Sequence, residues 1–198
     1  MDIQINSICK TAFYYLYNIR TIRKFLNPEC TEILVNAFVT SRLNFCNSLL
    51  YGLPNNQLRK LQGVQNAAAR LICNVGRFDY ITPSLYRLHW LPINYRIKFK
   101  ILLFVYKALN GIAPSYISDL LELKPASRYN LRSSIDTLLL KHPNFKSLST
   151  LGDRSLKCAG PKLWNEQPKG IRNATTVKIF KRLLKTYLFK KAFNLDNS

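Results

Sequence analysis

Apolar residues recur at every third or fourth position along most of the chain, and this spacing predicts amphipathic helices. The first stripe consists of Ile5, Ile8, Ala12, Leu16, Ile19, Ile22 and Leu26. Asn27 and Pro28 then predict the end of one helix and the start of another, because Asn is a preferred N-cap and Pro fits the first helical position.

The second and third helices are predicted from the same spacing. In the second helix, which Gly52 and Pro54 end, the positions expected to face the core are Leu34, Phe38, Phe45 and Leu49. In the third helix, which Asn55 or Asn56 is expected to cap, the apolar face consists of Leu58, Leu61, Val64, Ala68, Leu71, Ile72 and Val75. Gly76 is well placed to end this helix, since glycine readily adopts the left-handed backbone of a C-cap.

The stretch from Leu88 to Gly111 combines an apolar face with a row of cations. At about 100° per residue, one broad face holds Ile97, Ile101, Phe104, Val105, Ala108 and Leu109. Arg96, Lys100 and Lys107 fall together in a narrow stripe outside this face. A solvated helix face normally mixes Glu with Lys four residues apart, and no carboxylate is present in this stretch. The row is therefore a candidate contact with an anionic partner, although a plain solvated face remains an alternative.

A change of composition divides the chain into a helical region, 1–123, and a mixed C-terminal segment, 124–198, which is at first rich in Ser, Asn and Pro. Two short runs, 138–140 and 145–148, flank His142-Pro143-Asn144 and predict a short β-hairpin. A helix is expected over 153–164, interrupted by Gly160-Pro161. The predicted fold class is thus mainly α.

A basic amphipathic helix is expected to close the chain, from Thr175 or Thr176 to about Phe193. Its apolar face consists of Val177, Phe180, Leu183, Leu184, Tyr187 and Leu188. Its basic face consists of Lys178, Lys181, Arg182 and Lys185. Three interpretations remain open: a helix docked on the core with its cations toward phosphate, a helix on a membrane surface, and a calmodulin-type target.

The charge balance favours an anionic partner. Lys and Arg number 30 against 10 Asp and Glu, so the formal net charge is +20. Hydrophobic residues make up 47% of the chain, which is enough to form a core. A folded surface this positive most often binds nucleic acid, and less often an acidic membrane or protein. No apolar run approaches the ~20 residues that a membrane-spanning helix needs.

The sequence carries few groups suited to catalysis. Its histidines, His89 and His142, are more typical of structural positions, and no glycine-rich phosphate loop, G-x-S-x-G or H-E-x-x-H motif is present. The five cysteines are widely spaced and do not form a zinc or disulfide pattern. Carboxylates are scattered singly, whereas two-metal chemistry needs them clustered. We therefore expect no catalytic residue, no metal and no cofactor.

Several strings together carry a family resemblance. They are "INSICKTAFYYLYNIR", "LVNAFVTSRLNFCNSLLYGLP", "LQGVQNAAARLI", "ITPSLYRLHWLPINYRIKFKILLFVYKALNGIAPSYISDLL", "LRSS" and "GDRSLKCAGPKLWNEQP". In this order they resemble the C-terminal part of LINE-type (non-LTR) retrotransposon reverse transcriptases. The resemblance extends from about Ile5 to Lys190.

In that family this region includes the thumb, a helical element that grips the template–primer duplex. The resemblance implies this role for the cations Arg42, Arg59, Lys60, Arg96, Lys100 and Lys107. The palm signature, an aromatic residue followed by x-Asp-Asp, has no counterpart, because Phe78-Asp79-Tyr80 carries a single Asp in a different context. The family's endonuclease is also absent. Asn44 stands where relatives usually carry Asp, so the resemblance implies that a local salt bridge or cap is lost.

The first hypothesis is a helical, thumb-like fragment that binds the backbone of RNA, DNA or their hybrid and has no polymerase site of its own. Its expected partners include the missing palm of a full-length parent, and its expected location is intracellular, nuclear or cytoplasmic. The alternatives are a membrane-surface or protein-interaction module that acts through the last helix, and a degenerate, non-functional retroelement product from a truncated reading frame.

Overall fold

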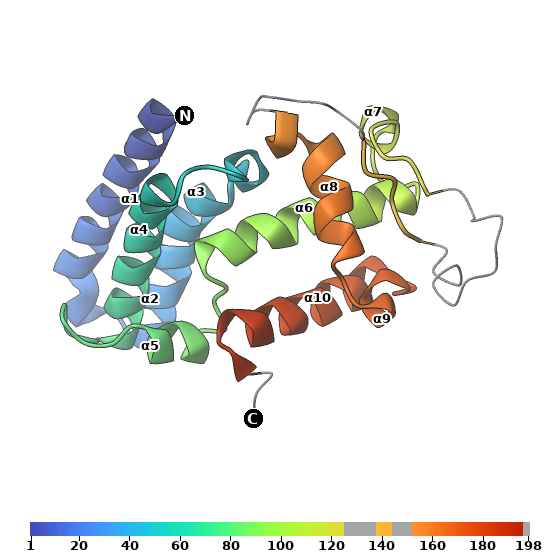
Figure 1. Ribbon diagram of the computed structural model, residues 1–198. Helices are drawn as coiled ribbons and strands as arrows, with labels where there is room; N and C mark the ends of the chain where they lie inside the picture. Colours follow the sequence, from blue (N-terminus) through green and yellow to red (C-terminus); the bar gives the residue numbers. More distant parts are fainter. Residues whose placement is uncertain (125–137, 144–151, 196–198) are drawn as a thin grey trace. The chain divides into compact units, whose positions relative to one another are not determined.

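The computed structural model describes residues 1–124, 138–143 and 152–195 (Figure 1). Over these residues the chain is mainly α-helical, which confirms the predicted fold class. It divides into two compact units, which we describe separately: unit 1 is Met1–Arg96 with Lys191–Ser198, and unit 2 is Ile97–Lys190. These units follow packing, whereas the division expected after residue 123 follows composition and stays a prediction.

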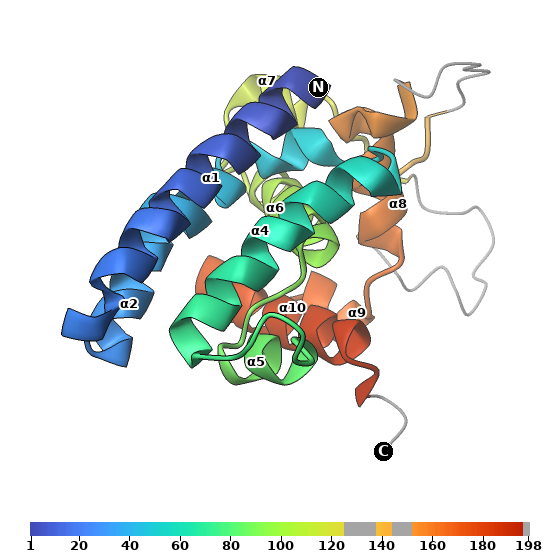
Figure 2. The ribbon, with the colours of Figure 1, turned by 90° about the vertical axis from the view of Figure 1, so that its left-hand side faces the viewer.

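Unit 1 contains helices that pack side by side. Their bounds are α1 Asp2–Ile22, η1 Arg23–Phe25, α2 Pro28–Val35, the π-helical η2 Asn36–Thr40, α3 Ser41–Asn44, η3 Asn47–Leu50, α4 Asn55–Cys73, α5 Thr82–Arg87 and the start of α6 Ile93–Leu109. In both views α1 and α4 lie alongside each other, and α2 packs against both (Figures 1 and 2).

The core face of α1 follows the predicted stripe. Ile5, Ala12, Leu16 and Ile19 are buried, as their spacing of three and four residues indicates. Ile22 was expected in the same stripe but is exposed, because α1 ends there and the chain turns through η1. The expected N-cap of α2 is confirmed, since Asn27 Oδ1 accepts a hydrogen bond from the backbone N–H of Cys30 at 2.7 Å.

The stripe predicted for the second helix is wrong. Its members Phe38, Phe45 and Leu49 are exposed, whereas the buried positions are Thr31, Val35, Val39 and Leu43. These buried residues are each four positions apart, and η2 has the wider turn of a π-helix. A π-helix has more residues per turn than an α-helix, so side chains four positions apart stay on the same face. The face turned toward the core therefore differs from the one that the α-helical spacing predicted.

The third predicted helix, α4, buries most of the expected face: Leu61, Val64, Ala68, Leu71 and Ile72. Its ends differ from the prediction. It begins at Asn55 without a side-chain cap, and it ends at Cys73, where Asn74 rather than Gly76 adopts the left-handed backbone with φ of 56°. Asn is the usual substitute for Gly at this position because its short polar side chain tolerates the conformation.

Unit 2 is built around three aromatic side chains. Its elements are the rest of α6, α7 Ser115–Ser118, η5 Gly152–Arg154, α8 Leu156–Asn165, α9 Lys169–Arg172 and most of α10 Val177–Ala192. The Tyr106 ring stacks on Phe180 with centroids 4.1 Å apart, and Trp164 lies 6.0 Å from the same ring. Both polar tips are satisfied, because Tyr106 donates to the carbonyl of Ala174 and Trp164 donates to that of Leu138, each at 2.7 Å. Trp164 is therefore a core residue.

Two other predictions for the C-terminal segment are modified. Leu140, in the first strand of the predicted hairpin, forms an isolated antiparallel bridge with Leu123, and the second strand, 145–148, lies outside the described residues. Helix α8 continues through Gly160-Pro161 rather than being interrupted. A Cβ at Gly160 would lie 3.1 Å from Val105 Cγ2, so the absent side chain lets α8 approach α6 closely. Pro161 has no backbone N–H to donate, yet the helix continues past it to Asn165.

Candidate functional site

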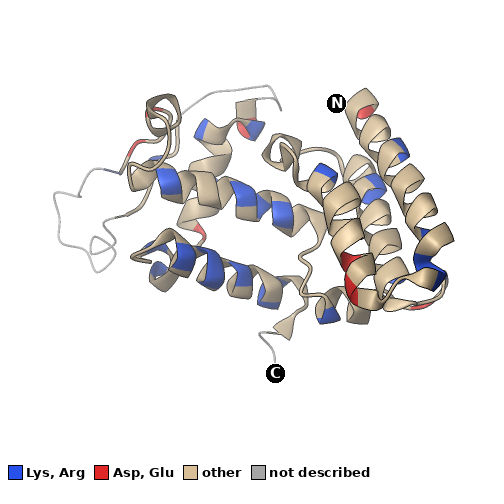
Figure 3. Cartoon of the chain, turned by 180° about the vertical axis from the view of Figure 1, so that it is seen from behind, with Lys and Arg blue, Asp and Glu red and all other residues tan. Residues whose placement is uncertain are grey.

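Helix α10 presents the most regular basic surface in unit 2. Phe180, Leu184 and Leu188 are buried at four-residue intervals and fix the helix to the core. The predicted cations, all exposed, are Lys178, Lys181, Arg182 and Lys185. Figure 3 shows Lys and Arg positions following one another along this helix. We call these four residues the α10 basic face.

The α10 basic face has no neutralising partner in the described part of the chain: none of its four side chains pairs with a carboxylate there. Elsewhere in unit 2, Glu122 is engaged by Lys141, with 3.1 Å between Oε2 and Nζ. That contact holds the pKa of the Glu122 carboxyl below its usual value, first through the hydrogen bond and then through charge. Like charges four residues apart repel by about 0.2–0.5 kcal/mol a pair. An anion bound on this face would relieve that repulsion.

Arg96, which sequence analysis placed in the α6 row, is bound within unit 1. Its Nε donates to the carbonyl of Leu91 at 2.8 Å, and its guanidinium lies over the Trp90 ring at 5.3 Å. A second donor reaches Asn44 Oδ1 at 3.2 Å. Burial lowers the pKa of Arg96 to about 10. These contacts use two of its five N–H donors, and its burial limits the access of a phosphate to the others.

Lys100 and Lys107, the other members of that row, lie in unit 2 and are half-buried. The ammonium of Lys100 lies 5.4 Å from the centre of the Phe104 ring, which is a cation–π distance. Apolar positions predicted for the same helix are buried as expected: Ile97, Ile101, Val105 and Ala108. Helix α6 ends at Leu109, and Gly111 just beyond it adopts the left-handed backbone with φ of 67°. The two lysines are thus less accessible than the α10 basic face.

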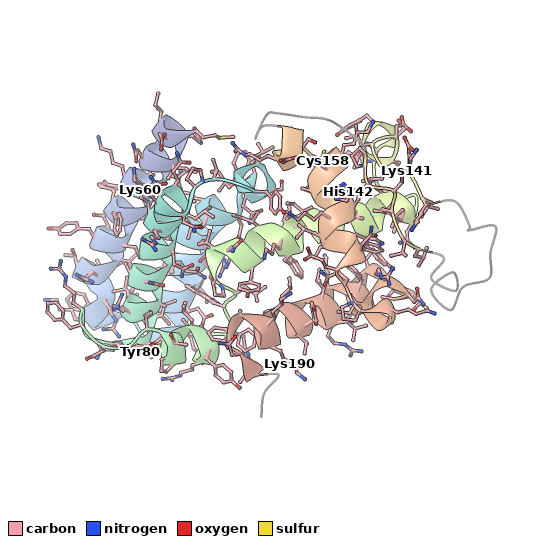
Figure 4. The ribbon with its side chains drawn as sticks, viewed as in Figure 1. Lys60, Tyr80, Lys141, His142, Cys158 and Lys190 are labelled. Carbon is pink, nitrogen blue, oxygen red and sulfur yellow. The ribbon has the colours of Figure 1, made fainter. Side chains whose placement is uncertain are left out.

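The remaining predicted cations belong to unit 1 and are exposed. Arg42 lies over the Tyr15 ring at 5.1 Å and donates to its hydroxyl at 3.4 Å. Lys60 projects from α4 and donates to Asn6 Oδ1 at 2.9 Å (Figure 4). Arg59 makes no such contact with the described residues. These side chains keep charge at the surface, and the structure does not gather them into one cluster.

A basic cluster in unit 1 was missed by the sequence analysis. Arg20, Arg23, Lys24 and Arg70 line a cleft of about 470 Å³. They lie at the ends of α1 and α4, some 50 positions apart in sequence. The only signal in the sequence is a basic residue in the last turn of each helix, and such residues are common because they oppose the negative end of the helix dipole.

Groups suited to catalysis do not cluster in the described ranges. No group of three or more His, Cys, Asp or Glu side chains there is placed to hold a metal ion. All five cysteines are free, and burial raises the pKa of the Cys9 thiol, so it is a poorer nucleophile than an ordinary cysteine. His89 and His142 are both exposed.

Among the described residues, no helix combines the length and apolar character needed to cross a membrane. Searches against protein-family models, curated proteins and solved structures found no match to this chain.

Proposed function

We propose that this chain binds the phosphate backbone of nucleic acid, as the thumb and C-terminal region of a LINE-type retrotransposon reverse transcriptase. The α10 basic face carries the proposal: four exposed cations on a helix whose opposite side is anchored in the core. A fixed helix holds its charges in register, and each contact with a phosphate releases a condensed counterion. RNA, DNA and their hybrid all supply the same phosphate chemistry.

The chain is proposed to act without its own polymerase chemistry. The paired aspartates of the palm have no counterpart in the sequence, and a palm from a full-length parent would supply them. Arg42, Arg59, Lys60, Lys100 and Lys107 then add to the positive field around the duplex. An intracellular location, nuclear or cytoplasmic, belongs to the same proposal. Nucleotide incorporation by the isolated chain would contradict this part of it.

The alternative, a membrane-surface or protein-interaction helix, is less well supported. A helix that lies on a bilayer inserts its apolar side into the headgroup region. In α10 that side consists of Phe180, Leu184 and Leu188, whose side chains are already buried in unit 2. Flotation with anionic liposomes tests the alternative: binding that depends on α10 while duplex binding is unaffected would favour it.

The direct test is a salt titration of binding to an RNA–DNA hybrid duplex. The test variant carries Lys178→Gln, Lys181→Gln, Arg182→Gln and Lys185→Gln. The slope of log K against log salt is negative, and each lost phosphate contact makes it less negative by about 0.9. The magnitude of the variant's slope should therefore fall by about 3 to 4.

A matched control removes the same charge from exposed positions outside the face, by Lys10→Gln, Lys124→Gln, Lys162→Gln and Lys169→Gln. The slope of log K against log salt for the control should differ from the wild-type slope by no more than about 0.9, the contribution of one phosphate contact. Equal slopes for wild type and the α10 variant would refute the proposed role of this face.

A further inference from the structure

The cleft in unit 1 gathers cations from two helix ends. Arg20 belongs to the last turn of α1, Arg23 and Lys24 to η1, and Arg70 to the last turn of α4. Figures 1 and 2 both show α1 and α4 finishing at the same end of unit 1. The rest of the lining is mixed: Leu26, Pro28, Leu71 and Val75 are apolar, and Thr31 and Asn74 are polar.

Helix dipoles alone do not account for this much positive charge. Each helix C-terminus is equivalent to about half a negative charge, so the ends of α1 and α4 together balance about one of the four cations. Among the residues that the structure describes, no Asp or Glu lines the cleft. Asp79 lies close by in sequence but is not among the lining residues. Its Oδ2 accepts a hydrogen bond from the backbone N–H of Gly76 at 2.8 Å.

Two of the guanidinium groups are held in place by the protein. Arg70 donates to the carbonyls of Gly76 and Asp79, at 3.2 and 3.3 Å. Arg23 donates to the side-chain oxygen of Asn74, the residue that caps α4 in the left-handed conformation. Each guanidinium has five N–H donors, so donors remain for a ligand. Groups fixed in this way lose little freedom when an anion binds.

Arg20 and Lys24 are the two free cations of the cleft. Neither side chain makes a hydrogen bond or ion pair with the described residues, although Lys24 lies over the Phe25 ring at 4.8 Å. Two oriented guanidinium forks and two adjustable cations suit a compact, doubly charged oxyanion. A guanidinium matches phosphate oxygens in pairs, which is the reason arginine predominates at phosphate sites.

We propose that this cleft binds a terminal phosphate, the dianionic phosphomonoester of a nucleotide or of the end of a nucleic-acid strand. The site uses other residues than the α10 basic face and goes beyond the backbone binding proposed above. An internal phosphodiester carries one negative charge, whereas a terminal phosphate carries up to two and leaves three oxygens for the four cations. The cleft volume of about 470 Å³ falls in the range of small-molecule sites.

The test compares a short single strand carrying a 5′-phosphate with the same strand carrying a 5′-hydroxyl, each with a fluorophore at the 3′ end. Fluorescence anisotropy with the full chain should show about tenfold tighter binding of the phosphorylated strand, which is the effect of one or two charge-assisted hydrogen bonds. Arg20→Gln with Lys24→Gln should abolish this preference, and circular dichroism should show an unchanged helix content.

A matched control, Lys10→Gln with Arg87→Gln, removes the same charge from exposed residues of unit 1 that do not line the cleft, and should keep the preference. Titration with AMP, followed by calorimetry, identifies the source of the phosphate. Saturable AMP binding that the double variant loses indicates free nucleotides, whereas a preference confined to the strand indicates strand ends. Equal affinity for the two strands together with no AMP binding would overturn the proposal.

The test of the cleft gives a result that does not depend on the proposed role of the α10 basic face. The α10 variant should weaken binding of both strands by a similar factor and leave their ratio unchanged. If the chain binds no strand at all, calorimetry with AMP still tests the cleft directly.

Discussion

The guanidinium of Arg96 donates a hydrogen bond to the side-chain oxygen of Asn44, with 3.2 Å between Nη1 and Oδ1. Asn44 is the position at which the resemblance to reverse transcriptases leads us to expect Asp. An Asp at this position would place its carboxylate within reach of Arg96. The observed hydrogen bond gives Arg96, a residue first considered as a phosphate contact, an internal function: its side chain ties the end of α3 to the start of α6 within unit 1.

We predict that Asn44→Asp stabilises the chain by about 1 kcal/mol, because a charge-assisted hydrogen bond to Arg96 replaces a neutral acceptor and Asn44 is solvent-exposed. The measurement is urea unfolding at neutral pH. Asn18→Asp, at an exposed position of α1, controls for the general benefit of an added carboxylate on a cationic protein. Similar gains in both variants would show that Arg96 has no specific effect.

The stability gain of Asn44→Asp should depend on pH in a defined direction. Arg96 would lower the carboxyl pKa in the folded state below its unfolded value of about 3.9. A group of this kind contributes its full stabilisation above the unfolded pKa and loses it as pH falls through the folded pKa. The free energies of unfolding of Asn44→Asp and wild type should therefore be equal in acid and differ near neutral pH.

Arg96→Met should leave duplex affinity within about twofold of wild type, since burial of the Arg96 guanidinium limits its access to a phosphate. The carbonyl of Leu91 would not be left unpaired, because it also accepts a hydrogen bond from Gln65 Nε2 at 2.8 Å. We therefore expect a stability change of only about 1 kcal/mol by unfolding. Gel shifts with the hybrid duplex measure this affinity. A loss of affinity similar to that of the α10 variant would show that Arg96 contacts the duplex.

Gly160→Val should destabilise unit 2 by about 2 to 3 kcal/mol, which is typical of an overpacked core. The added Cβ would lie 3.1 Å from Val105 Cγ2 and 3.3 Å from Leu121 Cδ2, and two further methyl groups would follow. Gly170→Val is the matched control, because nothing lies within 4 Å of a Cβ at that position. Thermal unfolding of the two variants gives the comparison, and equal melting temperatures would mean that α8 can move away from α6.

The sequence predicts some features well because the structure obeys a regular period there. In α10 the apolar and cationic positions separate cleanly, and Phe180, Leu184 and Leu188 are buried as the helical spacing requires. The stripe containing Phe38 and Phe45 was wrong because η2 has a π-helical turn, and a pattern analysis that assumes one fixed angle per residue cannot detect the change.

Sequence patterns were least informative where distant segments meet. Arg96 shares a helix face with Lys100, yet its partners Asn44 and Trp90 lie on other elements, so periodicity cannot show that it is engaged. The basic cleft depends on Arg23 and Arg70, which come from different helix ends. Each residue alone resembles an ordinary last-turn cation, and only the packing of α1 against α4 brings them together.

The α10 basic face should show opposite effects on stability and on binding. Lys181→Glu places a carboxylate four residues before Lys185, the favourable order for a helical ion pair, and relieves repulsion from Lys178. We expect the free energy of unfolding to rise by a few tenths of a kcal/mol. Duplex affinity should fall, because a cation that contacts a phosphate is replaced by a carboxylate that repels it. Lys169→Glu, at an exposed site of α9, is the control and should bind nearly as wild type. If Lys181→Glu weakens neither binding nor its salt dependence, the cations of α10 serve the helix alone.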